Sequence, residues 1–176
     1  SGHIIGMIAR CDQARGVFKA PAGETDGQLR GVIGLEYVMD DTEQGLLNPH
    51  GINGIRSFPN AGIVVFGART SRNGYINVRR TVDYIEDAIL AGTRWTTFES
   101  NDETLWGKIK ANIEAFLRGL WKAGGLKGSS EDQAFFVKCD AETTTEEDIA
   151  QGRVYCEIGV ATQKPAEFII FRVQVR

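Results

Sequence analysis

The residue types that most often carry chemistry are few in this chain, and their spacing does not suit catalysis or metal binding. The two histidines are His3 and His50, and His50 lies in a Pro-Gly turn with no second His or Cys at ligand spacing. A catalytic or ligating histidine works with partners that orient its ring, so we interpret His50 as a solvated turn residue. The sequence also contains neither G-x-S-x-G nor H-E-x-x-H. These features argue against the common hydrolase patterns.

A glycine-rich stretch at 124–130 reads GGLKGSS and superficially resembles a phosphate-binding loop. A P-loop needs Gly-Lys-Ser/Thr in that order, between a strand and the helix that it opens. Here the order is Lys-Gly-Ser, and the stretch follows a predicted helix and precedes a predicted strand. We therefore expect no nucleotide site in it.

The cysteines, Cys11, Cys139 and Cys156, are odd in number and widely spaced, and no C-x-x-C occurs. A zinc site or a dithiol redox motif is therefore not expected. Cys139 and Cys156 lie in strand-like runs, and we interpret them as small buried hydrophobic residues. Since N-x-S/T is also absent, the sequence suggests synthesis in a reducing, intracellular compartment.

The composition is that of an ordinary globular protein. The 176 residues are 42% hydrophobic and 24% charged, and a chain of this length buries about 70% of its unfolded surface. The net charge of -3 gives no electrostatic case for nucleic acid or an anionic membrane. No apolar run approaches the roughly 18 residues of a membrane span. Because the chain begins with Ser1, we expect a fragment or a processed protein.

Two charged clusters deserve separate interpretations. Arginines between residues 69 and 80 are followed at once by acids, which favours an ion-paired, solvated helix face over a phosphate site. Acids between 142 and 148 surround a predicted helix start, where they stabilise the macrodipole; a charged docking face is the functional alternative. The residues are Arg69, Arg72, Arg79, Arg80, Asp83, Glu86, Asp87, Glu142, Glu146, Glu147 and Asp148.

Apolar spacing of 3.6 residues predicts two long helices. Gly92 is expected to end the first, and Ser100 with Glu103 to cap the second. Thr144 with Glu147 is expected to cap a short third helix. The predicted helices are 42–47 (a single turn), 76–91, 101–123 and 145–151. Three tryptophans on or near the long helices are interpreted as core or interface anchors: Trp95, Trp106 and Trp121.

Short apolar runs predict strands, and 153–162 should pair with 166–175 as a hairpin around Lys164-Pro165. Residues 62–68 are expected to form a buried central strand. Residues 4–11 suit either the last turns of a helix or a short strand, and 16–28 an irregular loop or linker. The other predicted strands are 31–39, 55–58 and 134–139. The predicted fold class is α+β: an antiparallel sheet of about four strands, with two long helices packed on one face, plus a short helix.

The stretch 45–89 closely resembles the C-terminal region of the sheath proteins of contractile phage tails and related injection machines. The pattern R-x-F-P-x-x-G-x-x-V-x-G-A-R-T appears as Arg56 to Thr70, and Y-I-N-V-R-R as Tyr75 to Arg80. A polar loop at 71–74 departs from the family pattern. Further matches are GVFKAPA at 16–22, TRW at 93–95, FESND at 98–102, FVKCD at 136–140, GRV at 152–154 and PAEFIIF at 165–171.

This resemblance implies a structural protein without enzymatic activity or cofactor. Sheath subunits stack as hexameric rings around an inner tube and contract to drive the tube through a cell envelope. Neighbours are linked by chain termini that add strands to the sheet of this domain. The implied partners are other copies, the inner tail tube protein, and baseplate and tail terminator proteins, with no nucleic acid and no membrane insertion. The implied location is the virion tail, after synthesis in the bacterial host cytoplasm.

The resemblance also implies that 29–176 is the tube-proximal C-terminal domain and that 1–28 is a linker or the end of an upstream domain. Tube contacts should be mainly polar, because they must break during contraction. The candidate interface residues are Arg79, Arg80, Asp83, Glu86, Asp87, Glu146, Glu147, Asp148, Glu167, Phe168 and Arg172.

Two alternatives remain at this point: a small hydrolase or transferase with an unusual site, and a stand-alone module that binds a peptide strand at its sheet edge. The sequence leaves open whether the machine is a phage or another injection system, and whether it would be seen extended or contracted.

Overall fold

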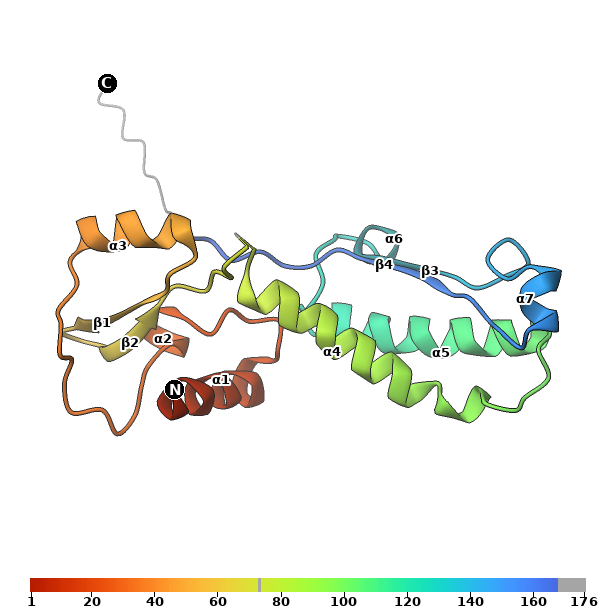
Figure 1. The fold of residues 1–176 in the computed structure, drawn as a ribbon, viewed down its shortest axis with the longest axis horizontal. Helices are drawn as coiled ribbons and strands as arrows, with labels where there is room; N and C mark the ends of the chain where they lie inside the picture. The colour runs from red at the N-terminus through yellow and green to blue at the C-terminus, as the bar shows by residue number, and fades with distance from the viewer. Residues whose placement is uncertain (73, 168–176) are drawn as a thin grey trace, which may run out of the picture. The chain divides into compact units, whose positions relative to one another are not determined.

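The computed structural model describes residues 1–72 and 74–167, and it confirms the α+β class (Figure 1). The described chain divides into two compact units. Unit 1 comprises Ser1–Cys11, Lys19–Asn77 and the described residues from Lys164 onward. Unit 2 comprises Asp12–Phe18 and Val78–Gln163.

Unit 1 is built around a short antiparallel hairpin. Strand β1 (Gly54–Phe58) pairs with β2 (Gly62–Phe66), with Arg56 opposite Val64. On the other side of β2, the Leu29 N–H donates to the Ile63 carbonyl at 2.8 Å. Because β2 has partners on both sides, its centre is buried, as the apolar run at 62–68 predicted.

Several helical segments precede this hairpin in the sequence. They are α1 (Gly2–Arg15), which begins in unit 1, α2 (Gly23–Asp26), α3 (Asp41–Leu47) and the 3-10 turn η1 (Asn48–His50). Helix α3 starts at a capping box in which Asp40 accepts from the Glu43 N–H and Glu43 accepts from the Asp40 N–H. Residues 4–11, for which the sequence left open a helix end or a short strand, lie within helix α1.

Unit 2 packs helices against a second strand pair. It contains α4 (Ile76–Gly92) beyond its first two residues, η2 (Arg94–Thr96), α5 (Glu103–Lys122), α6 (Glu131–Ala134), β3 (Phe135–Lys138), α7 (Glu146–Ala150) and β4 (Glu157–Val160). Strands β3 and β4 are antiparallel, with Phe135 opposite Val160.

The core of unit 2 forms along one stripe of α5. Ile109, Ile113 and Leu117 recur at helical spacing, and Leu117 is fully buried. They belong to one hydrophobic cluster with Phe135 and Val137 of β3. Alternation along β3 directs these two side chains to the same face, so α5 and the sheet form one core.

Two expectations about strands were wrong. The described strands form two separate two-stranded sheets instead of one four-stranded sheet, because each strand pairs with a partner close to it in sequence. Residues 31–39 form no strand; Gly31 and Gly34 interrupt the run, and no described strand pairs with it. Its Ile33 and Val38 are exposed instead.

The predicted final hairpin is also corrected in part. Strand β4 is shorter than the predicted 153–162, and it pairs with β3. Ala166 and Glu167 are in no strand, and the rest of the predicted strand at 166–175 lies outside the described residues. In the part of the chain that the structure describes, no helix is long and apolar enough to cross a bilayer.

Helix ends differ from expectation by one or two residues. Asp102, rather than Ser100, caps α5 by accepting from the Leu105 N–H at 2.9 Å. The α7 cap is Thr145 with Asp148 at the third helical position. In both cases a neighbouring residue with an equivalent side-chain oxygen makes the cap.

Candidate assembly surfaces

The charged face of α4 is largely engaged in ion pairs within the chain. Arg79 Nη2 lies 2.6 Å from Asp83 Oδ1, one helical turn away. Arg80 Nη1 and Nη2 donate to the two carboxylate oxygens of Asp12 at 2.8 and 2.5 Å. This two-point geometry is among the stronger hydrogen-bonded ion pairs. Arg80 therefore joins α4 to the end of α1, as the ion-paired interpretation of this helix face predicted.

The same face of α4 borders a groove of about 910 Å³ in unit 2. Asp87 lies at the groove, whereas Glu86 is exposed outside it. The apolar lining includes Phe18, Phe116 and Leu120. The Tyr84 and Phe116 ring centroids lie 6.1 Å apart, so α4 and α5 form an aromatic wall with acidic residues at its edge.

The three acidic residues of α7 differ in their contacts. Asp148 Oδ2 accepts from the Thr145 hydroxyl at 2.7 Å, and Asp148 Oδ1 accepts from Arg153 Nη2 at 2.7 Å. The Thr145 hydrogen bonds and the neighbouring Arg153 hold the pKa of Asp148 below its ordinary value. Glu146 and Glu147 are exposed. Glu147 Oε1 also accepts from Gln151 Nε2 at 3.1 Å. Asp148 thus stabilises the helix start, and the docking role of Glu146 and Glu147 remains a prediction.

Glu167 is placed by an ion pair within unit 1. Arg69 Nη2 donates to Glu167 Oε2 at 2.6 Å, and this hydrogen bond raises the pKa of Arg69. Both side chains are largely buried. The other predicted interface residues near the C-terminus, Phe168 and Arg172, lie outside the described residues. The interface role of Glu167 remains a prediction.

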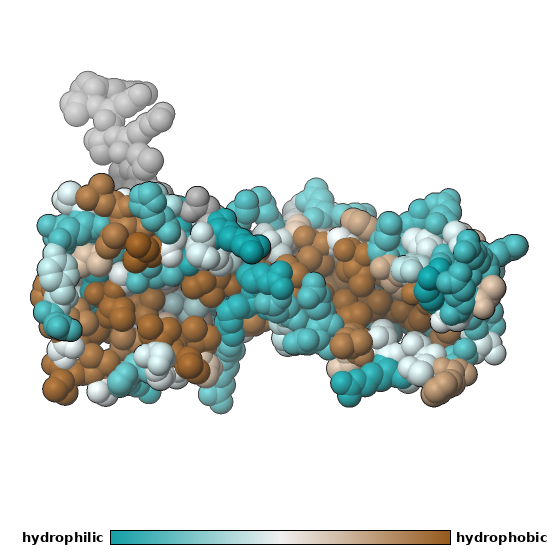
Figure 2. All heavy atoms as spheres, viewed as in Figure 1, coloured by the Kyte–Doolittle hydropathy of each residue, from teal (hydrophilic) through white to brown (hydrophobic). Residues whose placement is uncertain are grey.

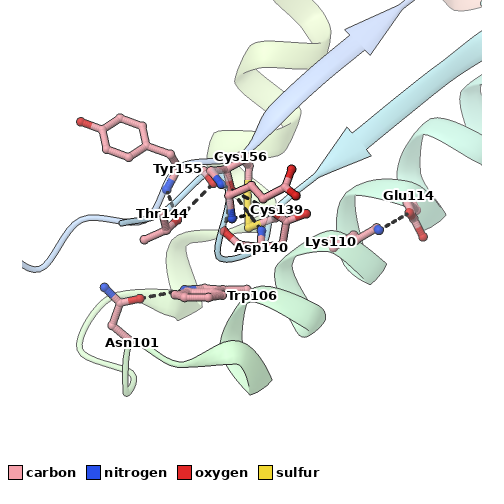
Figure 3. The surroundings of a disulfide bond; sticks show 11 residues. Asn101, Trp106, Lys110, Glu114, Cys139, Asp140, Thr144, Tyr155 and Cys156 are labelled. Carbon is pink, nitrogen blue, oxygen red and sulfur yellow. Dashed lines mark hydrogen bonds and ion pairs between the residues drawn. A yellow bond between two sulfur atoms is a disulfide. The ribbon is translucent and has the colours of Figure 1, made fainter. Parts of the chain in front are cut away.

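Cys139 and Cys156 form a disulfide bond (Figure 3), which corrects the interpretation of them as small buried hydrophobic residues: Cys139 is buried, Cys156 is half-buried, and the two are bonded. The register pairs Lys138 with Glu157, so the two cysteines lie opposite each other one residue beyond the described ladder. Their Cα atoms are 4.5 Å apart, close to a non-hydrogen-bonded antiparallel pair. Beyond the bond, Thr144 Oγ1 accepts from the Tyr155 N–H at 3.0 Å.

The three tryptophans differ in their environments. Trp106 is buried and its indole N–H donates to Asn101 Oδ1 at 2.8 Å (Figure 3), and Trp121 donates to the Gly128 carbonyl at 3.0 Å. Trp95 is 44% exposed, and Phe98 nearby is fully exposed. Sequence reasoning missed Phe98 as a surface residue, because residue type alone indicates a buried ring.

Unit 1 also exposes hydrophobic residues, and Figure 2 shows such residues gathered over it on the face drawn. Contiguous exposed apolar surface often marks contact sites. The exposed large hydrophobic residues of this unit are Ile5, Ile33, Tyr37, Val38, Leu46 and Ile52.

Comparison with known families gives matches along the whole chain. Residues 69–176 match the model of the phage tail sheath C-terminal domain, and residues 1–71 match that of the phage tail sheath central domain. This chain belongs to the phage tail sheath family. The two family domains meet at residues 69–71, whereas the boundary at 28–29 remains a prediction from sequence alone.

Curated relatives support the sheath family assignment. The tail sheath protein of Vibrio phage KVP40 is 29% identical over 96% of this chain and 25% of its own length. A putative prophage major tail sheath protein of Pseudomonas aeruginosa is 28% identical over 99% of this chain and 45% of its own length. The chain therefore spans between a quarter and a half of these relatives.

Solved sheath structures share the fold. A chain of the anti-feeding prophage baseplate matches 98% of this chain with a TM-score of 0.91 and 36% identity. A chain of the PVC sheath complex, from an extracellular contractile injection system in the contracted state, matches 97% with a TM-score of 0.90 and 37% identity. This chain covers 49% of each of those chains. Its fold is thus that of part of a sheath subunit.

Proposed function

We propose that this chain is part of a contractile sheath subunit that polymerises as stacked hexameric rings around an inner tube. On triggering, the rings compress and drive the tube through a cell envelope. The observation that carries this proposal is the match of nearly the whole chain to a contracted sheath, with a TM-score of 0.90. Assembly would need contacts with other copies, the tube, the baseplate and the tail terminator.

Strand addition between neighbours is the proposed link within the lattice. Among the described residues, β3 and β4 pair only with each other as strands, which leaves an outer edge on each. A strand from another copy can join such an edge through main-chain hydrogen bonds. Those bonds survive a rigid-body rotation of the subunits if the connecting arm bends.

Tube contact is proposed to be polar and to lie on the C-terminal domain. The acids of α7 support this, because Glu146 and Glu147 are exposed and close together on one helix. On α4, Glu86 and Asp87 are exposed in the same way. Exposed charges contribute little binding energy when fully hydrated, so such a contact can be broken during contraction.

Charge reversal tests the tube-facing role of α7. The variant E146K/E147K leaves the Thr145–Asp148 cap in place, so the helix should still form. We expect weaker assembly of the full-length protein on purified tubes, measured by electron microscopy. The control E24K/E103K reverses two exposed charges on other helices and should assemble normally. Unchanged assembly of E146K/E147K would remove α7 from the tube interface.

The alternative is a stand-alone module that binds a peptide strand at the β3–β4 edge without contraction. The same unpaired strand edges favour it. A full-length protein that stays monomeric and still binds a peptide would support this alternative.

A further inference from the structure

The loop after α4 carries an aromatic side chain in an unfavourable setting. Phe98 is fully exposed, and its φ of 73° is the only positive value among the described non-glycine residues. A left-handed backbone conformation strains a residue that has a Cβ. An exposed ring also lacks the favourable free energy that burial of its apolar surface would give. Strain and exposure at one residue are independent observations, and both point to a contact that the isolated chain does not make.

The loop is held in place rather than left loose. The Glu99 N–H donates to the Thr96 carbonyl at 3.1 Å. Asn101 Nδ2 donates to the Arg153 carbonyl at 2.9 Å, while its Oδ1 accepts from the buried Trp106. A loop fixed in this way loses little conformational entropy on binding.

Two further hydrophobic residues close to Phe98 in sequence are also exposed. Leu90, on the last turn of α4, is 65% exposed, and Trp95 is 44% exposed. We call Leu90, Trp95 and Phe98 the knob. Phe and Trp are enriched at protein interfaces, and Trp is frequent among the residues that contribute most binding energy.

The groove described above supplies a complementary surface on the same unit. Its α5 side includes Ala115 and Gly119, which have only a methyl group and no side chain, respectively, beside the larger Phe116 and Leu120. Asp87 borders it, and Arg94, beside the knob, is exposed. The chemistry of the two surfaces is therefore complementary: an apolar lining with an acidic edge suits an aromatic knob with an adjacent arginine.

We propose that the knob of one copy inserts into the groove of a second copy. The inference rests on the proposed function, because the solved relatives are sheath assemblies. In unit 2, α4 and α5 lie alongside each other (Figure 1), with groove residues at 80–87 and 115–123 and the knob at 90–98. A contact between two different patches is heterologous, and repetition of it produces rings or helical filaments.

Variants on the two sides test the contact separately. F98S removes the ring, and G119L adds a side chain to the groove lining. Apart from the adjacent residues and the backbone of α5 itself, no atom lies within 4 Å of a Cβ at Gly119, so the backbone there accepts a side chain. Leucine also favours a helix more than glycine does, so G119L should fold well. For each we expect a rise of about 10- to 100-fold in the concentration needed for polymerisation of the full-length protein. The control K108S alters an exposed residue of α5 that lies in neither the knob nor the groove and should polymerise like the original protein.

Cross-linking shows which surfaces meet. Thr97 is exposed beside Phe98, so T97C places a thiol at the knob and keeps the ring. T97C protein mixed with G119C protein and a short bis-maleimide should give covalent dimers that neither variant gives alone. Dimers from T97C alone would overturn the proposal, as would normal polymerisation of F98S and G119L. In that last case, tubes formed by the unaltered protein would leave the proposed sheath function intact. If the unaltered protein forms no tubes, the proposed function itself fails.

Discussion

Arg69 and Glu167, 98 residues apart, form a two-point ion pair in which Arg69 Nε and Nη2 lie 2.9 and 2.6 Å from Glu167 Oε2. Arg69 is itself fixed through its main chain, since its N–H and carbonyl bind the side chain of Asn53, each at 2.8 Å. The pair therefore anchors the last described residue of the chain to the segment that follows β2.

Loss of this ion pair should loosen the end of the described chain. In E167Q the amide cannot provide the charge that Arg69 binds, so amide hydrogen exchange near Lys164–Glu167 should be faster. R69Q should have the same effect. Because both changes remove one interaction, the double variant R69Q/E167Q should exchange no faster than either single variant. Additive effects would show that the two residues act separately.

The stripe of α5 should dominate the stability of unit 2. Leu117 is fully buried, so L117A should lower the free energy of unfolding by about 2–5 kcal/mol. Leu46 on α3 is 67% exposed, and L46A should change it by less than about 0.5 kcal/mol. Urea denaturation followed by circular dichroism measures both. Equal effects would contradict the assigned core.

The disulfide should make stability depend on reductant. It closes a loop with a sequence separation of 17, and a bond of that span contributes about 3 kcal/mol through restriction of the unfolded chain. Dithiothreitol should therefore lower the melting temperature of the oxidised protein. The variant C139S/C156S should melt below the oxidised protein, and its melting temperature should not respond to reductant. If dithiothreitol lowered the melting temperature of C139S/C156S as well, the reductant would be acting on a group other than this disulfide.

Acid should weaken the start of α7. The pKa of Asp148 is lowered in the folded chain, so its contribution is present above about pH 4 and is lost as the pH falls through the lowered value. The melting temperature of D148N should therefore be below that of the original protein at pH 7 and approach it in acid. T145A should lower the free energy of unfolding by about 1 kcal/mol at neutral pH. A difference in melting temperature between D148N and the original protein that does not change with pH would contradict this role of Asp148.

The long helices were predictable because their signals are local. Apolar residues at 3.6-residue spacing mark α4 and α5 without knowledge of any partner. The run at 62–68 likewise predicted the buried β2. Residues 31–39 were wrongly predicted to form a strand. A strand needs a neighbouring strand to pair with, and the sequence of one segment does not show whether such a neighbour exists.

The candidate surfaces were less predictable. Pairing of Cys139 with Cys156 depends on the β3–β4 register, which sequence separation does not reveal. The engagement of Asp148 and Glu167 by arginines depends on contacts within each unit. Phe98 gave no signal, because neither its left-handed backbone nor its exposure follows from residue type. Charge on α4 and α7 was visible, but which carboxylates face solvent was not.

Electron microscopy of the full-length protein, expressed alone, tests the central claim most directly. A sheath subunit should polymerise into striated tubes with the width of a contracted sheath. Discrete monomers that never polymerise at any concentration would contradict the account, and would show that the chain has the sheath fold without its assembly function.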